Sequence, residues 1–221
     1  MKLIANNLGL KINGMEILNN ISFQIYNNSF TCIIGPNGVG KSSILKIITK
    51  QITNYSGSIT DFNISQIAYL PQNLPTPPFL NVREVASLGL YGSKLSHKEK
   101  NNSTLDLLDE CGITSIKDRL FTDISSGEKQ RTWLAFALAQ SKEIIIMDEP
   151  FAEIDLLGRE KFFSLLKSIA QRKMLILVTH DIEMAIRYSN RIISLKQGQK
   201  HFDGASADFK KIWVQSSINS Q

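Results

Sequence analysis

The sequence predicts an α/β fold in which helices cover a mainly parallel sheet. Three short apolar runs, FTCIIG, EIIIMDE and MLILVT, are rich in β-branched residues and have the length of buried strands. Stretches with helical periodicity separate these runs along the chain. Strands that alternate with helices in this way are typical of a parallel sheet with helices on its faces.

The N-terminal part of the chain supplies the first strands and the first helix. We expect strands near Lys2–Ile12, Glu16–Ile25 and Phe30–Ile34. The third strand stops at Gly35, as a buried strand that enters a turn should. The run KSSILKIITK then continues as a helix, because its leucine and isoleucines recur at helical spacing.

A helical segment interrupts the α/β pattern. The proline-rich NLPTPP breaks the chain, and VREVASLGL and STLDLLDEC follow as helices without a strand between them. We therefore expect a single domain over residues 1–221. Its parts are a β subdomain plus core (residues 1–74 and 127–210), a helical insert (75–126) and a tail (211–221) that is polar and frayed from Gln215.

Composition limits the classes of function. With 43% hydrophobic residues and a net charge of +5, the chain reads as a globular protein that tolerates anionic partners. Its basic residues are scattered, so we expect no nucleic-acid partner. No apolar run approaches the roughly 18 residues that span a bilayer and no export signal is evident, which predicts a cytoplasmic protein. Cys32 and Cys111 are expected to be buried thiols, not a disulfide.

The strongest chemical signal is GPNGVGKS, which matches G-x-x-x-x-G-K-[ST] at each fixed position. It lies between a predicted strand and a helix, where backbone N–H groups can bind phosphate oxygens. Lys41 is expected to reach the β- and γ-phosphates, and Ser42 to bind Mg²⁺. A tight turn without a ligand is the alternative that motif and context together disfavour. The expected nucleotide-binding residues here are Gly35, Pro36, Asn37, Gly38, Val39, Gly40, Lys41, Ser42 and Ser43.

Two carboxylates end the next predicted strand, in IIIMDEP. Asp148 can hold Mg²⁺ through water opposite Ser42, and Glu149 is expected to act on the attacking water as general base. An apolar run that ends in Asp-Glu is often only a strand end. The phosphate-binding loop earlier in the chain makes the catalytic interpretation the better one.

With both motifs in place, the chain resembles the ATP-binding cassette (ABC) proteins from about Leu3 to Gly204. The resemblance implies a P-loop NTPase core with an N-terminal antiparallel β subdomain and a helical insert, and ATP and Mg²⁺ as cofactors. Within YLPQN, it implies that Gln72 contacts Mg²⁺ and senses a membrane partner. AEID places Asp155 in the family's D-loop, and LVTHD makes His180 the histidine that contacts the γ-phosphate.

The resemblance also implies a mechanism in which two cassettes stack head to tail as a homodimer. Each ATP then lies between the phosphate loop of one copy and the signature segment of the other, which corresponds to residues 125–128 in this chain. Ser126 stands where the family has a glycine, and a positive φ there would cost on the order of 1 kcal/mol. The family's adenine-stacking aromatic residue falls at Ile12. The signature residues are Ser125, Ser126, Gly127 and Glu128.

No charged catalytic position is missing, so we expect a working ATPase, with a degenerate half-site as the alternative. Two segments resemble the zinc, manganese and iron importers: EPFAEID, with Phe151 at the usual threonine, and VREVASLGLYGSK. They predict import of a metal ion or metal chelate, although the three histidines form no ligand cluster in this chain. An exporter subunit, or a soluble cassette that acts on DNA or ribosomes, is the alternative.

The expected partner is an integral membrane permease that docks near Gln72–Leu90, with a solute-binding protein in the full system. The ATPase would then be peripheral on the inner face of the cell membrane. Four apolar residues follow Gln72 where a plain loop would be polar, and they either contact the permease or cap the core of the insert. They are Pro77, Pro78, Phe79 and Leu80.

Overall fold

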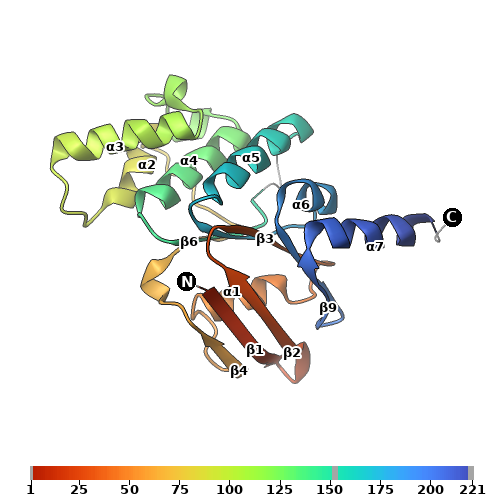
Figure 1. Ribbon diagram of the computed structural model, residues 1–221. Coiled ribbons are helices and arrows are strands. Elements are labelled where there is room, and N and C mark those ends of the chain that lie inside the picture. The colour runs from red at the N-terminus through yellow and green to blue at the C-terminus, as the bar shows by residue number, and fades with distance from the viewer. Residues whose placement is uncertain (1, 151–153, 219–221) are drawn as a thin grey trace.

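Two β-sheets organise the fold (Figure 1). The computed structural model describes residues 2–150 and 154–218. A three-stranded antiparallel sheet has the strand order β2-β1-β4, and a six-stranded sheet has the order β5-β6-β7-β3-β8-β9. Neighbouring strands from β5 to β8 are parallel, and β9 pairs with β8 in the antiparallel sense. The predicted α/β class with an antiparallel N-terminal subdomain is therefore confirmed.

The antiparallel sheet is built from a hairpin. Asn13 and Gly14 both have positive φ, the conformation that a tight two-residue hairpin turn requires. The turn pairs Ile12 with Met15 and places the tip of the hairpin at one end of the sheet. The strands are β1 (Lys2–Ile12), β2 (Met15–Tyr26) and β4 (Ser56–Thr60).

The central strands β3, β6 and β7 of this sheet are short and almost fully buried, which explains why they read as continuous apolar runs. β3, β6 and β7 run side by side in the same direction, so their carboxyl ends meet at one edge of the sheet. The strands are β3 (Ser29–Ile34), β5 (Ile67–Leu70), β6 (Ile144–Asp148), β7 (Met174–Val178), β8 (Arg191–Lys196) and β9 (Gln199–Ala205).

The hydrophobic core has two halves, one on each face of the parallel sheet. Because side chains alternate along a strand, Cys32 belongs to one half and Ile33 to the other. Helices α4, α5 and α6 cover the first face, and α1 and the antiparallel sheet cover the second. Helices α1 (Lys41–Ile48), α5 (Leu156–Ile169), α6 (Ile182–Tyr188) and α7 (Ser206–Ile218) belong to this core.

The helical insert forms one end of the molecule (Figure 1). Capping boxes start its helices at Asn81 and Ser96, and the second box begins α3 earlier than the apolar run STLDLLDEC suggested. Helix α4 (Ser126–Ala139), which follows the expected insert, packs against both helices of the insert. These helices are α2 (Val82–Ser87) and α3 (His97–Glu110).

Several elements escaped the sequence analysis, namely β4, β5, β8, β9 and α7. The expected frayed tail is wrong up to Ile218, because α7 extends to that residue. Phe209 of α7 packs on Phe202 of β9 with ring centroids 5.1 Å apart, and this contact anchors the helix to the sheet. Cys32 and Cys111 are free and buried as expected, and burial raises the pKa of Cys111 to about 12.

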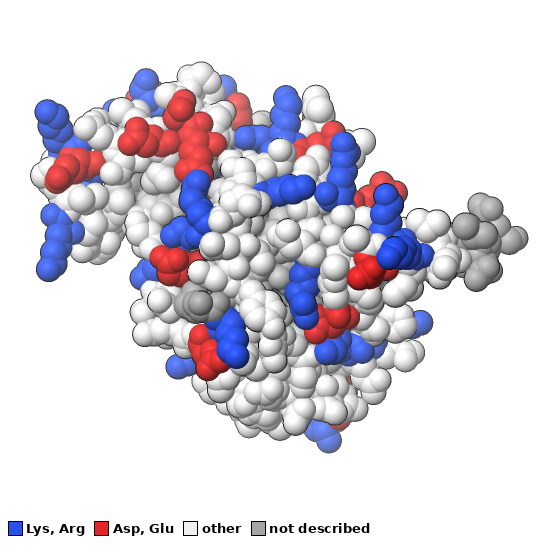
Figure 2. Space-filling view, in the orientation of Figure 1, with Lys and Arg blue, Asp and Glu red and all other residues white. Residues whose placement is uncertain are grey.

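The charged side chains are interspersed. On the face that Figure 2 shows, Lys and Arg alternate with Asp and Glu instead of gathering by sign. None of the helices within residues 2–150 and 154–218 is long and apolar enough to span a membrane. Across that same part of the chain, no three His, Cys, Asp or Glu residues group as a metal site would require.

Candidate nucleotide-binding and hydrolysis site

The loop between β3 and α1 has the conformation of a phosphate cradle. Gly38 and Gly40 have positive φ, which glycine adopts without steric cost. At Gly40 a side chain would also collide with Leu18, since a Cβ there would lie 2.5 Å from a methyl group of that residue. No side chain caps the start of α1, so the N–H groups of its first turn can serve a ligand.

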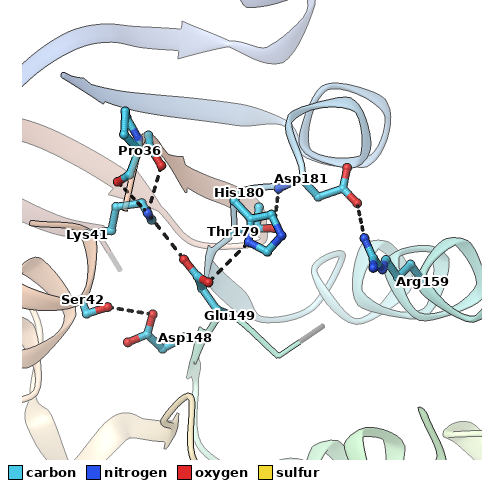
Figure 3. A network of polar contacts seen from close by, with 10 residues as sticks. Pro36, Lys41, Ser42, Asp148, Glu149, Arg159, Thr179, His180 and Asp181 are labelled. Atoms are coloured by element: carbon cyan, nitrogen blue, oxygen red, sulfur yellow. Dashed lines mark hydrogen bonds and ion pairs between the residues drawn. The ribbon is translucent and has the colours of Figure 1, made fainter. Parts of the chain in front are cut away.

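Lys41 points into this loop (Figure 3). Its ammonium group donates hydrogen bonds to the carbonyl oxygens of Gly35 (2.9 Å) and Pro36 (3.0 Å). The same nitrogen lies 3.5 Å from a carboxylate oxygen of Glu149. The side chain is only 5% exposed, so the positive charge is held inside the loop, where phosphate oxygens would meet it.

Ser42 and Asp148 form the second pair of the site. The Ser42 hydroxyl donates to a carboxylate oxygen of Asp148 at 3.1 Å. Asp148 is almost fully buried, and this burial raises the pKa of its carboxyl group above the usual range, partly offset by the Ser42 hydrogen bond. Mg²⁺ prefers such oxygen ligands, and a cation would relieve the cost of burying the carboxylate. The residues therefore fit a Mg²⁺ site.

Glu149 occupies the centre of the polar network (Figure 3). Its backbone has a φ of 45°, which is uncommon for glutamate, and its N–H donates to the carbonyl oxygen of Val178. This backbone places the carboxylate between Lys41 and His180, whose Nδ1 lies 3.4 Å from it. The His180 side chain is 58% exposed, so it can also reach a ligand. A carboxylate held this way can orient a water molecule and accept its proton.

A cleft of about 350 Å³ joins these groups to the tip of the β1–β2 hairpin. Ile12 lines the cleft at the position expected for adenine packing, and Gln72 enters it from the segment after β5. Ile17 of β2 also lines it, and the sequence analysis missed this residue because an apolar strand residue carries no chemical signal. The cleft also contains Asn37, Gly38, Gly40, Lys41, Ser42, Ser43 and Glu149.

The signature segment starts helix α4 and does not line this cleft. Ser125 caps the helix, and Glu128 completes the capping box. Ser126 is the first residue of α4 and is not among the residues with positive φ. The strain considered for serine at this position therefore does not arise.

Asp155 also stands outside the cleft. Its side chain accepts a hydrogen bond from the N–H of Gly158 at 2.7 Å and so caps α5. Ile154, which replaces the family's leucine in the D-loop, is buried. Phe151, on which one resemblance to metal importers rests, lies outside the described residues.

Comparisons with known proteins show which family the chain resembles. A family model described as ABC transporter matches residues 18–152, more than half of the chain. A Thermotoga maritima protein named "probable metal transport system ATP-binding protein" is 34% identical over 99% of this chain and 93% of its own length. The hemin import ATP-binding protein HmuV of Photobacterium damsela subsp. piscicida is 31% identical over 90% of this chain and 82% of its own length. A solved structure of cbiO1 from Clostridium perfringens, part of the ABC transporter complex cbiONQ, has a TM-score of 0.87 at 26% identity and covers 99% of this chain and 94% of that one.

Replacing Asp148 with asparagine tests the Mg²⁺ site. The variant loses a buried charge but keeps an acceptor for Ser42, so its melting temperature without nucleotide should not fall below that of the wild type. We expect Mg²⁺ to add several degrees to the melting temperature with ATP in the wild type, but not in the variant. Thermal unfolding with ATP, with and without Mg²⁺, measures this. Asp208→Asn on the surface is the control, and an Asp148→Asn variant that keeps the Mg²⁺ increment would remove Asp148 from the site.

Replacing Ser126 with glycine tests the signature segment. Because Ser126 has no positive φ and the Ser125 cap is intact, the variant should change ATP turnover less than about tenfold, or about 1.4 kcal/mol in the barrier. Steady-state phosphate release from matched protein preparations measures the change. A gain above about 100-fold, equivalent to about 2.7 kcal/mol, would mean that the natural signature is crippled.

Proposed function

The chain belongs to the ABC transporter family and is an ATP-hydrolysing subunit of such a transporter, and from this we propose that two copies close around two ATP molecules. Their closure and reopening drive a separate membrane permease that imports a metal ion or a metal chelate. The observation that carries the proposal is the position of Glu149, between Lys41 and His180 and beside the Ser42–Asp148 pair.

Each side chain of the network has a role in hydrolysis. When ATP binds, the Lys41 ammonium group gives up its contacts with the loop carbonyl oxygens and with Glu149, and it contacts the β- and γ-phosphate oxygens instead. Ser42, Asp148 and Gln72 would hold Mg²⁺, which would neutralise negative charge on the phosphates. Glu149, released from Lys41, orients the attacking water and accepts its proton. His180, which follows β7, contacts the γ-phosphate and stabilises its position.

The second copy supplies the signature residues, which a single chain does not bring to its own nucleotide cleft. Ser125, Ser126 and Gly127 begin a helix outside the chain's own cleft, so the positive end of its dipole can face a phosphate held by the other copy. Among the described residues, an added Cβ at Gly127 would meet only one side-chain atom, at 3.8 Å, so this part of the chain leaves the helix start sterically open to a partner. Loss of the γ-phosphate removes the shared ligand and lets the dimer open.

The direction and cargo of transport rest on similarity. The relatives cited above are named for metal transport and hemin import, which supports an importer over an exporter or a soluble cassette. A solute-binding protein would deliver the cargo to the permease. The ATPase would lie on the inner face of the membrane and would itself bind neither cargo nor nucleic acid.

The permease docks near Gln72–Leu90. Phe79 is 87% exposed at the tip of the proline-rich segment, whereas Leu80 next to it packs against the core. An aromatic side chain this exposed is not a cap for the core of the insert, which favours the docking interpretation. The segment leads directly from Gln72 in the nucleotide cleft to helix α2, so it can couple the two sites.

Replacing Glu149 with glutamine should leave ATP binding intact, lower steady-state hydrolysis at least about 100-fold and trap an ATP-bound dimer. Glutamine keeps the size of the side chain but cannot accept the proton of the attacking water. Phosphate release and size-exclusion chromatography with ATP measure the two effects. Glu183→Gln, on the exposed side of α6, is the matched control, and unchanged hydrolysis in Glu149→Gln would remove Glu149 as the base.

Replacing Phe79 with aspartate should uncouple the ATPase from its permease without unfolding it. We expect loss of permease co-purification from detergent-solubilised membranes, with a melting temperature within about 2 °C of the wild type and an unchanged basal ATPase rate. Leu80→Asp, at a packed position, should instead lower the melting temperature by several degrees. A destabilised Phe79→Asp protein that still binds the permease would contradict docking here.

A further inference from the structure

Two leucines at the start of α5 are exposed without an evident role. Leu156 is 67% exposed and Leu157 is 61% exposed. The cap from Asp155 fixes this helix turn, and the guanidinium Nε of Arg159 donates to the carbonyl oxygen of Ile154 at 2.7 Å. Adjacent large apolar side chains on a rigid turn are a more specific signal than one exposed leucine. We call Leu156 and Leu157 the leucine knob.

An apolar cavity of about 690 Å³ lies between the phosphate loop, β8, β9 and α7. Its aromatic wall is preformed: Phe209 packs on Phe202 with centroids 5.1 Å apart, and Trp213 stacks on Phe209 at 6.4 Å. Nucleotide hydrolysis as proposed above gives the apolar part of this cavity no function. Its apolar lining consists of Ile34, Ile182, Leu195, Phe202, Phe209, Ile212 and Trp213.

The knob and the cavity border the same surface. The guanidinium of Arg159, in α5, lies 3.5 Å from the carboxylate of Asp181 (Figure 3). Asp181 caps α6, whose first residue Ile182 lines the cavity, while Arg159 lies within one helical turn of the knob. The ion pair therefore stands between the two features.

We propose that the leucine knob of a second copy fills this cavity, and that the reciprocal contact forms at the same time. The proposal rests on the ATP-dependent dimer proposed above. In a two-fold symmetric interface each surface feature meets its complement twice, so one chain must carry both the knob and the cavity. This chain carries both, on either side of one ion pair.

A second copy is the occupant that the geometry favours. Pro36, Asn37, Glu149 and His180 line the cavity, and Asn37 and Glu149 also line the nucleotide cleft. A partner that closes over ATP at the cleft therefore also covers the mouth of the cavity. The insertion would shield Glu149 and His180 from bulk water only in the assembled dimer, which confines efficient hydrolysis to that state.

Dimer affinity provides the first test. In the Glu149→Gln background with ATP, the double change Leu156→Ala and Leu157→Ala should raise the dimer dissociation constant at least about tenfold, because each copy loses buried apolar surface. Ile212→Ala in the cavity wall should weaken the dimer in the same direction, and combining it with the knob changes should be less than additive. Sedimentation measures association, and Leu95→Ala, at another exposed leucine, should leave it unchanged.

Cross-linking provides the second test. A chain with Leu157→Cys mixed with a chain with Ile212→Cys should form an intermolecular disulfide when ATP is present. Chains that carry only one of the two changes cannot form this bond within themselves, and the native Cys32 and Cys111 are buried and do not compete. Equal mixtures of Leu95→Cys and Ile212→Cys chains serve as the control.

The outcomes separate the two proposals. If Glu149→Gln with ATP stays monomeric, the dimer proposed as the function fails. If the dimer forms but neither the knob nor the cavity changes weaken it, and no cross-link appears, the knob-in-cavity contact is wrong. A small amphipathic anion that fills the cavity beside Lys196 and His201 without affecting the dimer would also overturn it.

Discussion

The alignment of three buried parallel strands is the constraint on which the site depends. Because β3, β6 and β7 share one direction, Lys41, Asp148, Glu149 and His180 follow their carboxyl ends and meet at one edge of the sheet. Each strand is held by apolar contacts on both faces, so the polar side chains do not contribute to its placement. The core can therefore hold charges in an arrangement that suits a ligand better than it suits the empty protein.

That arrangement is electrostatically costly in the absence of nucleotide. Asp148 is buried as a carboxylate, and Lys41 is held by two carbonyl oxygens and by Glu149. These contacts compensate the buried charge of Lys41 until phosphate oxygens replace them. In the proposed mechanism, the same exchange would free the Glu149 carboxylate for water, so binding of the substrate and activation of the base would follow from one movement of the Lys41 side chain.

The sequence predicted the site residues that belong to short local motifs. It did not predict features that depend on tertiary contacts. The phosphate loop follows from glycine spacing beside a strand, and Asp148 and Glu149 follow from the strand end. The backbone angle at Ser126 could not be read from residue type, and the structure shows that serine begins a helix there. Helix α7 was missed although Phe209, Ile212 and Trp213 recur at helical spacing, and the packing of Phe209 on Phe202 of β9, with Trp213 stacked on Phe209, shows which face is buried.

The exposure of the leucine knob is another feature that could not be predicted from the sequence. In the sequence, Leu156 and Leu157 begin a run that includes the buried Phe162 and Phe163, and helical spacing alone would place them with the core. The parallel sheet ends below this turn, at Asp148, so no strand is left for the leucines to cover. The signature segment and Asp155 likewise start helices outside the cleft. In the proposed dimer, a single chain would therefore present the binding half of a site, and its surface would carry the complementary half for another copy.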